Sequence, residues 1–365
     1  MRNKQRDKIM TQEKSSAPRI AAAQIRLLER LSNACAVSGD EGALRQVVLE
    51  QVRSAADDVI VDALGNVLVT CRGQGKDRPR VMVAAHMDEV GFLLTHKENE
   101  GIFHFDTVGR IDARQLVGKP VLVGSEQIPG VIGVKPVHLT EIEERSKVIS
   151  IKSLRIDIGL GKDSKVKVGD RATFATRFFR LGRNLCGKAF DDRIGVATLI
   201  ELVTHAPTNI DLLAAFTVQE EIGLRGARVA AYTFDPDLAF VLDCTPAFDL
   251  PSWDGEENTR YNTRLGAGPA IYIADGGTIS DPRLIQLLVR TAEEEGIPYQ
   301  FRQPGGGGTD AGAIQRQRAG IPSVSISVPG RYLHTPVSLV RLEDWKQTLN
   351  LVYAALRRIT SKTLT

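Results

Sequence analysis

One segment, Leu213-Ala-Ala-Phe-Thr-Val-Gln-Glu-Glu-Ile-Gly223, joins an apolar run to a pair of acids. The apolar run has the length and composition of a buried strand, which would carry Glu220 and Glu221 at its C-terminal end. In α/β sheets, ligands bind beyond that end of the strands. Two adjacent carboxylates repel each other unless a cation lies nearby. A metal ion would relieve the repulsion by binding one Glu and leaving its neighbour as a base.

Three more predicted strands are each followed by an imidazole or carboxylate side chain. Each strand is a short run, apolar or alternating, of the length typical of strands. Segments with helical spacing lie between them, which is the alternation expected of an α/β fold. The strands and the side chains that follow them are Val81–Ala85 with His86, Leu238–Leu242 with Asp243, and Ser323–Val328 with His334, which comes after a break at Pro329-Gly330.

Two predicted helices begin with capping signals. Ser38 and Glu41 form a capping-box pattern before a helix that runs to about residue 54. Ser280 is the expected N-cap of a helix over Asp281–Glu295.

The sequence changes character between Gly91 and Asp170, where short β-rich segments alternate with Gly, Pro and charged turns. This pattern predicts a small β domain inserted into an α/β domain. The expected division is a disordered leader over residues 1–20, a discontinuous catalytic domain over 21–90 and 175–365, and the inserted domain over 91–174. The leader is polar and has no apolar core, so we do not expect a secretory signal.

Composition excludes several classes of protein. The 365 residues are 42% hydrophobic and 25% charged, with a net charge of +3, which is typical of a globular chain. No basic stripe interleaved with aromatic residues is present, so we expect no nucleic-acid binding. No apolar run reaches the roughly 18 residues of a membrane span. The four cysteines have no paired spacing, which favours a reducing compartment such as the cytoplasm.

The acidic and imidazole side chains form a plausible metal-binding set. Two His and three carboxylates suit two Zn²⁺ ions that share one carboxylate and leave a position for water. Two such ions can activate the water and polarise a carbonyl, while the remaining Glu accepts and passes on a proton. The candidates are His86, Asp191 in the stretch Ala189–Gly195, the Glu220–Glu221 pair, Asp243 and His334.

Each candidate also has a purely structural explanation. A histidine after a strand is often a satisfied core residue, and an acidic pair before a helix can cap it and favour its dipole. Asp243 can form a turn, one Glu of the pair can bind an Arg, and Cys244 is best explained as a buried thiol. The run Gly305–Gly308 can be a linker, since it lacks the Lys-Ser/Thr of a phosphate loop. All these explanations would have to hold together for the metal site to be absent.

The chain from about residue 22 onward resembles the dinuclear metallo-aminopeptidases of the glutamyl aminopeptidase and tetrahedral (TET) aminopeptidase group. Several motifs together carry the resemblance, and they are far more specific in combination than any one of them alone. They are Ala85-His-Met-Asp-Glu-Val-Gly-Phe92, Gly187-Lys-Ala-Phe-Asp-Asp-Arg-Ile-Gly195, Val218-Gln-Glu-Glu-Ile-Gly-Leu-Arg-Gly226, Asp243, Gly307-Gly-Thr-Asp-Ala311 and Arg331-Tyr-Leu-His-Thr-Pro336.

The resemblance implies a role for each site residue. Asp191 would bridge two divalent metal ions, Zn or Co, and a cis peptide would join it to Asp192. His86 with Asp243 would complete one metal site, and Glu221 with His334 the other. The general base would be Glu220. The Asp88 carboxylate would hydrogen-bond the second ring nitrogen of His86.

The resemblance also implies a fold and an assembly. The fold would be a zinc-peptidase-like α/β/α domain with a mostly parallel sheet, and the insertion would be a small β-barrel for dimerisation. Dimers could build a tetrahedral dodecamer. The segment after Asp243 and the Gly-rich loop would line the pocket for the N-terminal side chain. Lys135 or Arg331 could select acidic side chains there, although a solvated surface position is the stronger explanation for both.

The sequence therefore predicts a cytoplasmic aminopeptidase that removes residues from the free N-terminus of peptides. A carboxypeptidase or amide deacylase with the same dinuclear centre is the first alternative. A non-catalytic binding scaffold is the second, and it would require that one ligand be missing. A cellulase is disfavoured because no acid pair flanked by sugar-stacking aromatic residues is visible.

Overall fold

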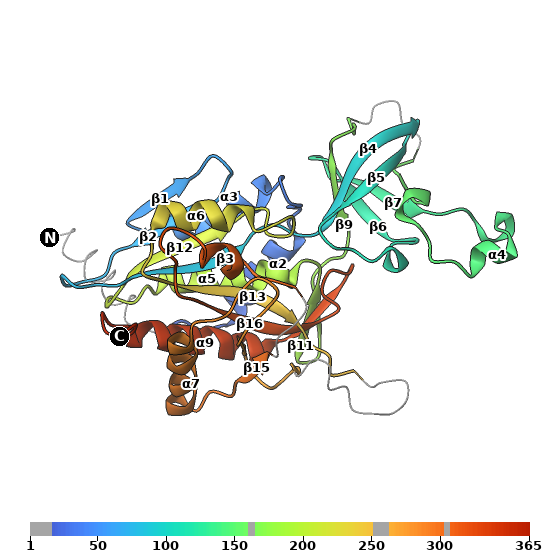
Figure 1. The fold of residues 1–365 in the computed structure, drawn as a ribbon. Coiled ribbons are helices and arrows are strands. Elements are labelled where there is room, and N and C mark those ends of the chain that lie inside the picture. The colour runs from blue at the N-terminus through green and yellow to red at the C-terminus, as the bar shows by residue number, and fades with distance from the viewer. Residues whose placement is uncertain (1–16, 160–164, 251–262, 303–306) are drawn as a thin grey trace.

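The structure, a computed structural model, describes residues 17–159, 165–250, 263–302 and 307–365. Its two parts are an α/β layered domain and a β-barrel that stands beside it (Figure 1). Residues 1–16 of the predicted leader and Gly305–Gly306 of the Gly-rich loop lie outside the described residues. Ile20 is described, and it is buried against the core of the α/β domain.

The α/β domain contains an eleven-stranded sheet. Its four central strands run parallel, so their carboxyl ends meet at one edge. The strands on either side are antiparallel to their neighbours. In spatial order they are β1 (Asp58–Val61), β2 (Val67–Cys71), β12 (Asp211–Thr217), β3 (Arg80–His86), β13 (Leu238–Pro246), β16 (Ser323–Arg331), β17 (Ser338–Arg341), β11 (Asn184–Gly187) and β10 (Phe179–Leu181), with β14 (Ala270–Tyr272) and β15 (Gln300–Arg302) off this path.

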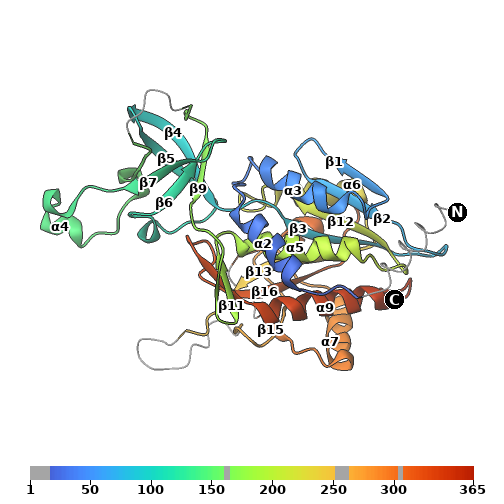
Figure 2. The ribbon, with the colours of Figure 1, turned by 180° about the vertical axis from the view of Figure 1, so that it is seen from behind.

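Helices cover both faces of this sheet, as Figures 1 and 2 show from opposite sides. One face packs against α6 (Arg225–Phe234) and α8 (Ala311–Ile314). The other packs against α2 (Ala22–Asn33), α3 (Gly42–Val52), α5 (Phe190–Thr204), α7 (Pro282–Glu295) and α9 (Leu342–Arg358). The arrangement is the predicted α/β/α layering.

Strand β3 shows why the sequence forms this layered core. Val81, Val83 and Ala85 point into the larger hydrophobic cluster, whereas Met82 and Ala84 point into the smaller one on the opposite face. Side chains alternate across a strand, so a strand with helices on both faces must be apolar throughout. The continuous apolar run therefore places His86, the last residue of β3, at the carboxyl edge of the sheet.

The inserted segment forms a closed barrel of six strands. Its interior is a separate hydrophobic cluster, in which Phe92 packs edge-on against Phe105 and Phe174. The barrel strands are β4 (Gly91–Asn99), β5 (Ile102–Val108), β6 (Pro120–Val123), β7 (Ile128–Gly133), β8 (Arg155–Asp157) and β9 (Arg171–Phe174), with short helices η1 (Ala113–Gln115), η2 (Val137–Leu139), α4 (Ile142–Arg145) and η3 (Ile151–Ser153) between them. The prediction of an α/β fold with an inserted β-barrel is confirmed.

Several local predictions differ from the structure. The sheet is mixed rather than mostly parallel, because its outer strands pair antiparallel. Strand β12 ends at Thr217, so Glu220 and Glu221 lie in the turn after the strand. Strand β16 continues through Pro329-Gly330 to Arg331, since Gly330 still pairs with Val340 of β17.

Both predictions of the residue that caps a helix were wrong. Ser38 makes no cap and instead donates a hydrogen bond from Oγ to Asp88 Oδ2, at 2.6 Å. Helix α7 is capped by the side chain of Asp281, which accepts from the backbone N–H of Arg283. Among the described residues, every helix is too short or too polar to cross a membrane.

Candidate metal centre

The predicted site residues meet around one cavity of about 670 Å³ at the carboxyl edge of the central strands. All five candidate ligands and one candidate base line it: His86, Asp191, Glu220, Glu221, Asp243 and His334. They come from five separate segments between residues 86 and 334, so only the fold brings them together. Asp88 does not line the cavity and lies buried behind it.

Asp191 occupies the centre of this group. Its Oδ1 lies 3.1 Å from His86 Nε2, and its Oδ2 lies 3.2 Å from His334 Nε2. The two oxygens of one carboxylate therefore face two different imidazoles. The peptide bond between Asp191 and Asp192 is cis, as the resemblance implies.

Two further carboxylates lie beside this pair of imidazoles. Glu221 Oε1 is 3.3 Å from His334 Nε2. One donor atom each from His86, Asp191 and Glu221 lie within 4.8 Å of one another, which is close enough for metal binding. Asp243 is buried, and its Oδ1 accepts from the backbone N–H of Cys244 at 2.6 Å.

Asp88 contacts the site in a different way from the one expected. Its backbone oxygen lies 3.2 Å from His86 Nδ1, closer than its carboxylate Oδ1 at 3.5 Å. The carboxylate instead accepts the backbone N–H groups of Glu220 and Glu221, at 3.0 and 3.2 Å. Asp88 therefore fixes the turn that carries the acidic pair as well as the ring of His86.

Burial and mutual repulsion disturb the acid–base behaviour of these groups. Burial raises the pKa of Glu220 and of Asp243 well above the usual range, and nearby carboxylates add to the effect. Burial alone would lower the pKa of His334, but its contacts with Asp191 and Glu221 raise it to about 11. The site therefore concentrates acidic groups that are costly to bury without cations.

Backbone conformation around the site is unusual. Positive φ values occur at eight described residues other than glycine; four of them flank the candidate ligands and a fifth, His334, is a candidate ligand itself. Such conformations cost about 1–3 kcal/mol each and are common at functional sites. No sequence signal marks them, since none of the five is Gly, Asn or Asp. They are Ala189, Gln219, Leu224, Tyr332 and His334.

A buried ion-pair cluster adjoins the site and received no role from the sequence. Lys188 Nζ lies 2.7 Å from each carboxylate oxygen of Glu89, and Arg193 Nη2 lies 3.2 Å from one of them. All three side chains are almost fully buried. The motifs quoted above contain all three, but their sequence separation of about a hundred residues hides the contact.

The walls of the cavity agree with the expected position of two segments, and they exclude the less favoured of the two explanations for Lys135 and Arg331. Cys244, Pro246, Gly307 and Gly308 line it, as expected of the segment after Asp243 and of the Gly-rich loop. Lys135 and Arg331 do not. The first is exposed on the barrel, and Arg331 is bound to Asp249 at 2.7 Å. Among the described residues, the arginines that line the cavity are Arg110 and Arg302, neither of which was predicted from the sequence.

The donor set fits divalent metal ions. Two imidazole nitrogens facing a shared carboxylate, with further buried carboxylates around them, are the ligands that Zn²⁺ and Co²⁺ accept. A layered α/β domain with such a donor set at the carboxyl edge of its parallel strands has the ligands that a metal-dependent hydrolase needs.

Comparison with known proteins identifies the family. The chain belongs to the M42 glutamyl aminopeptidase family, whose model matches residues 65–351 and whose members are metal-dependent. A TET aminopeptidase from a marine sediment Thaumarchaeota archaeon is 36% identical, with a TM-score of 0.88 over 94% of this chain and 99% of that one. The TET1 peptidase of Pyrococcus horikoshii is 34% identical, with a TM-score of 0.81 over 92% of this chain and 100% of that one.

A curated relative points the same way. The lysyl aminopeptidase of Pyrococcus furiosus is 32% identical over 345 residues, which cover 91% of this chain and 96% of that protein. The prediction of an aminopeptidase-family hydrolase is confirmed.

Proposed function

We propose that this protein is a two-metal aminopeptidase in which Asp191 bridges the ions. One observation carries the proposal: the two carboxylate oxygens of Asp191 face the Nε2 atoms of His86 and His334, at 3.1 and 3.2 Å. Carboxylates bridge metals in this way when each oxygen binds one ion, and paired metals in hydrolases are about 3.5–4 Å apart.

The remaining ligands divide between the two ions by position. Glu221 lies against His334 and would complete that site. Asp243 lines the same cavity, where the charges of Asp191 and Asp192 raise its pKa beyond the effect of burial and the charge of His86 acts in the opposite direction. It would complete the site of His86. When bound, the ions would supply an activated water and polarise the scissile carbonyl.

Glu220 is the candidate general base. It lines the cavity beside the ligands, and its backbone N–H is held by Asp88 at 3.0 Å. Its carboxylate lies among the candidate ligands, where it could take a proton from water and return it to the leaving amine. Glu221, its neighbour, faces His334 instead, so the two acids have different surroundings and different roles.

The test compares wild type with Glu220→Gln on an aminoacyl-p-nitroanilide after metal loading. Gln keeps the size of Glu but cannot accept the proton, so we expect kcat to fall by about 100-fold or more. Metal content should stay at two ions per subunit, measured by elemental analysis. Activity within about tenfold of wild type would contradict the general-base role.

The alternatives are separated by substrate. An aminopeptidase requires a free N-terminal amine, whereas a carboxypeptidase or deacylase does not. Paired peptides with free and acetylated N-termini therefore decide between them. Cleavage of only the free-amine peptide is expected, and preferential cleavage of the acetylated one would favour the deacylase.

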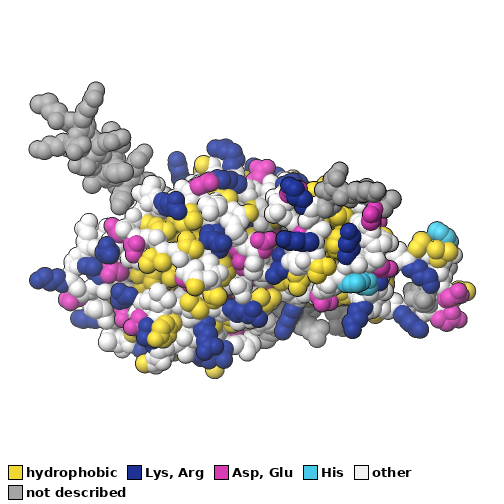
Figure 3. Space-filling view, turned by 90° about the horizontal axis from the view of Figure 1, so that it is seen from above, with side chains coloured by type: hydrophobic (Ala, Val, Ile, Leu, Met, Phe, Trp, Pro, Cys, Tyr) yellow, Lys and Arg dark blue, Asp and Glu magenta, His cyan; other side chains and the backbone are white. Residues whose placement is uncertain are grey.

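Assembly and compartment are also proposed. The TET1 peptidase of Pyrococcus horikoshii can assemble into a tetrahedron or a large octahedral shell. We propose a homo-oligomer in which the barrel mediates dimerisation. All four cysteines are free, in keeping with a reducing compartment such as the cytoplasm. Lys and Arg are spread over the face in Figure 3 rather than gathered in one stripe, in keeping with peptide substrates rather than nucleic acid.

A further inference from the structure

The two histidines of the metal centre are oriented by different parts of the molecule. His86 Nδ1 faces the backbone oxygen of Asp88, two residues away in the same domain. His334 Nδ1 faces the backbone oxygen of Arg110, at 3.0 Å, from a position 224 residues earlier in the chain. Arg110 lies in the turn that follows barrel strand β5. One histidine is thus oriented from within its own domain and the other from the barrel.

His334 has little local support of its own. It lies on the loop between β16 and β17, its φ is +58°, and a third of its side chain is exposed. The Nε2 atom of the ring faces the carboxylates of Asp191 and Glu221, and its Nδ1 atom faces the Arg110 carbonyl. An Nδ1–H donated to a carbonyl leaves Nε2 unprotonated, which is the form that binds a metal.

Gly109 brings the barrel turn close enough for this contact. Its φ is +79°, and a Cβ added there would lie 2.7 Å from Val90 Cγ1 and 3.4 Å from the Cβ of Glu221. A side chain at this position would therefore push the turn away from the segment that joins the two domains and from a candidate ligand. Only glycine combines this backbone conformation with so close an approach.

We propose that the Gly109–Arg110 turn of the barrel is a positioning element of the metal centre. It rests on the proposed two-metal function. The Arg110 carbonyl fixes the tautomer and direction of the His334 ring, and Gly109 allows the turn to reach it. The barrel therefore completes the metal site, in addition to any role in assembly.

Gly109→Ala tests the proposal. We expect this substitution to weaken the binding of the metal ion at His334 by about 10- to 100-fold, as is usual when a group that orients a ligand is lost. The other step, at His86, should be unchanged. Calorimetric titration of the metal-free protein with Zn²⁺ measures both. Gly118→Ala is the matched control: Gly118 is in the same barrel with φ +73°, but an added Cβ would meet nothing within 4 Å.

Equal loss in both glycine variants would show general backbone strain and overturn the proposal, as would normal binding of both ions by folded Gly109→Ala. Adding Val90→Ala to Gly109→Ala removes the nearest clash and should restore part of the lost affinity. If Gly109→Ala does not fold, amide exchange of the wild-type protein decides. Zinc loading should slow exchange across residues 109–112 but not at Gly118, and equal rates with and without zinc would refute the proposal.

Failure of this proposal is distinct from failure of the two-metal function. In the first case wild type still binds two ions and cleaves free-amine peptides. In the second, wild type itself binds fewer than two ions.

Discussion

Asp88 shows how one buried side chain can order several groups of the site. Its carboxylate accepts from Ser38 Oγ and from the backbone N–H groups of Glu220 and Glu221. Burial would raise the pKa of Asp88, but the contacts with His86 and these donors outweigh it and lower the pKa. Asp88 therefore stays ionised at neutral pH and accepts all three hydrogen bonds, which fixes the direction of the acidic pair.

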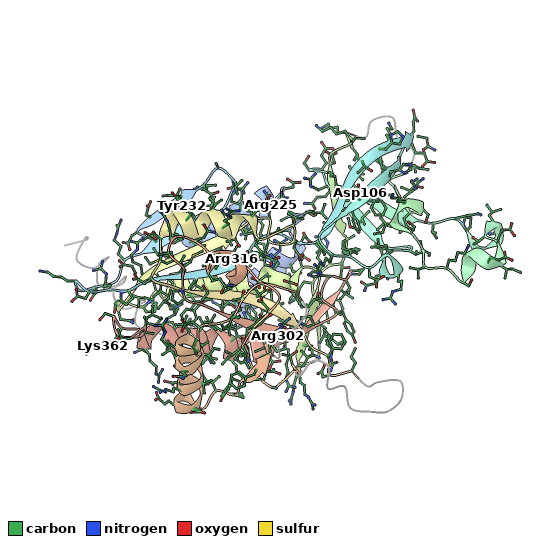
Figure 4. All side chains as sticks on the ribbon, in the orientation of Figure 1. Asp106, Arg225, Tyr232, Arg302, Arg316 and Lys362 are labelled. Atoms are coloured by element: carbon green, nitrogen blue, oxygen red, sulfur yellow. The ribbon has the colours of Figure 1, made fainter. Side chains whose placement is uncertain are left out.

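Arg302 adds a cationic side chain to the lining of the cavity that the acidic candidate ligands also line. It stands at the end of β15, as Figure 4 marks, and it is almost fully buried. Its guanidinium lies 4.5 Å from the centre of the Tyr272 ring, and its Nε donates to Thr245 Oγ1 at 3.1 Å. A rigidly held cation in the pocket wall favours an acidic substrate side chain over a basic one.

We therefore predict that Arg302→Met reduces kcat/KM for glutamyl-p-nitroanilide about tenfold more than for leucyl-p-nitroanilide. That ratio corresponds to about 1.4 kcal/mol, a size expected for charges several ångströms apart in a partly shielded site. Arg331→Met is the control, since Arg331 is bound to Asp249 and does not line the cavity. Equal losses on both substrates would contradict a role in selectivity.

The sequence indicated the candidate site residues that follow strands but not those that depend on contacts between distant parts of the fold. His86, Asp243 and the Glu220–Glu221 turn could be found because each follows an apolar run whose direction is readable. Arg302 ends a strand of only three residues with no chemical motif, and its place in the cavity depends on the pairing of β15 with β14. The contact of Arg110 with His334 depends on how the barrel is placed against the α/β domain, and the local sequence pattern does not specify that placement.

Among the secondary-structure elements, β9 of the barrel and the start of α5 are linked through Glu89. Thr173 of β9 donates to one oxygen of Glu89, and Lys188 binds both. Lys188 also donates to the backbone oxygen of Ala34 after helix α2. These contacts bury an ion pair where the barrel, the sheet edge and two helices meet. Removing one partner of this ion pair would leave a buried charge unpaired, which destabilises the folded protein.

Lys188→Met should lower the free energy of unfolding by about 3 kcal/mol, because it leaves the buried carboxylate of Glu89 with less compensating charge. Chemical denaturation at fixed protein and metal concentration measures the change. Lys165→Met is the control, because Lys165 pairs with Glu126 on the barrel surface, where ion pairs contribute little. A Lys188→Met variant as stable as the control would show that the cluster is not stabilising.

The helices and strands could be predicted where the hydrophobic periodicity was strong. Their direction in the sheet could not be predicted where it depends on which strands pair. The apolar runs of β3 and β13 gave both the strands and their burial on two faces. The direction of the outer strands did not follow from sequence, because β17 and β11 pair antiparallel through contacts between residues 184 and 341. Ser38 resembled a helix cap, but helix α3 begins only at Gly42, so Ser38 lies too far before the helix to cap it, and its hydroxyl donates to the buried Asp88 carboxylate.

At the scale of the whole molecule, the barrel has two distinct ends. The inner end contacts the candidate metal centre through Arg110, and the outer end carries a segment with α4 that projects from the barrel on the side away from the α/β domain (Figure 1). Apolar side chains are exposed on this segment, and Figure 3 shows such side chains at the far end of the molecule. Val137, Leu139, Ile142 and Val148 are 65%, 60%, 76% and 78% exposed. A group of this kind on one projecting segment is typical of an interaction surface.

If this segment forms the dimer contact, a charge placed on it should break the assembly. A lysine buried at an interface without a partner costs several kcal/mol, so Ile142→Lys combined with Val148→Lys should lower the mass of the native particle. Mass photometry or light scattering measures it. Ile60→Lys is the control: Ile60 is 50% exposed on β1, at the edge of the sheet in the other domain. The double variant should become smaller while the control keeps the wild-type mass. Unchanged mass in the double variant would place the subunit contact outside this segment.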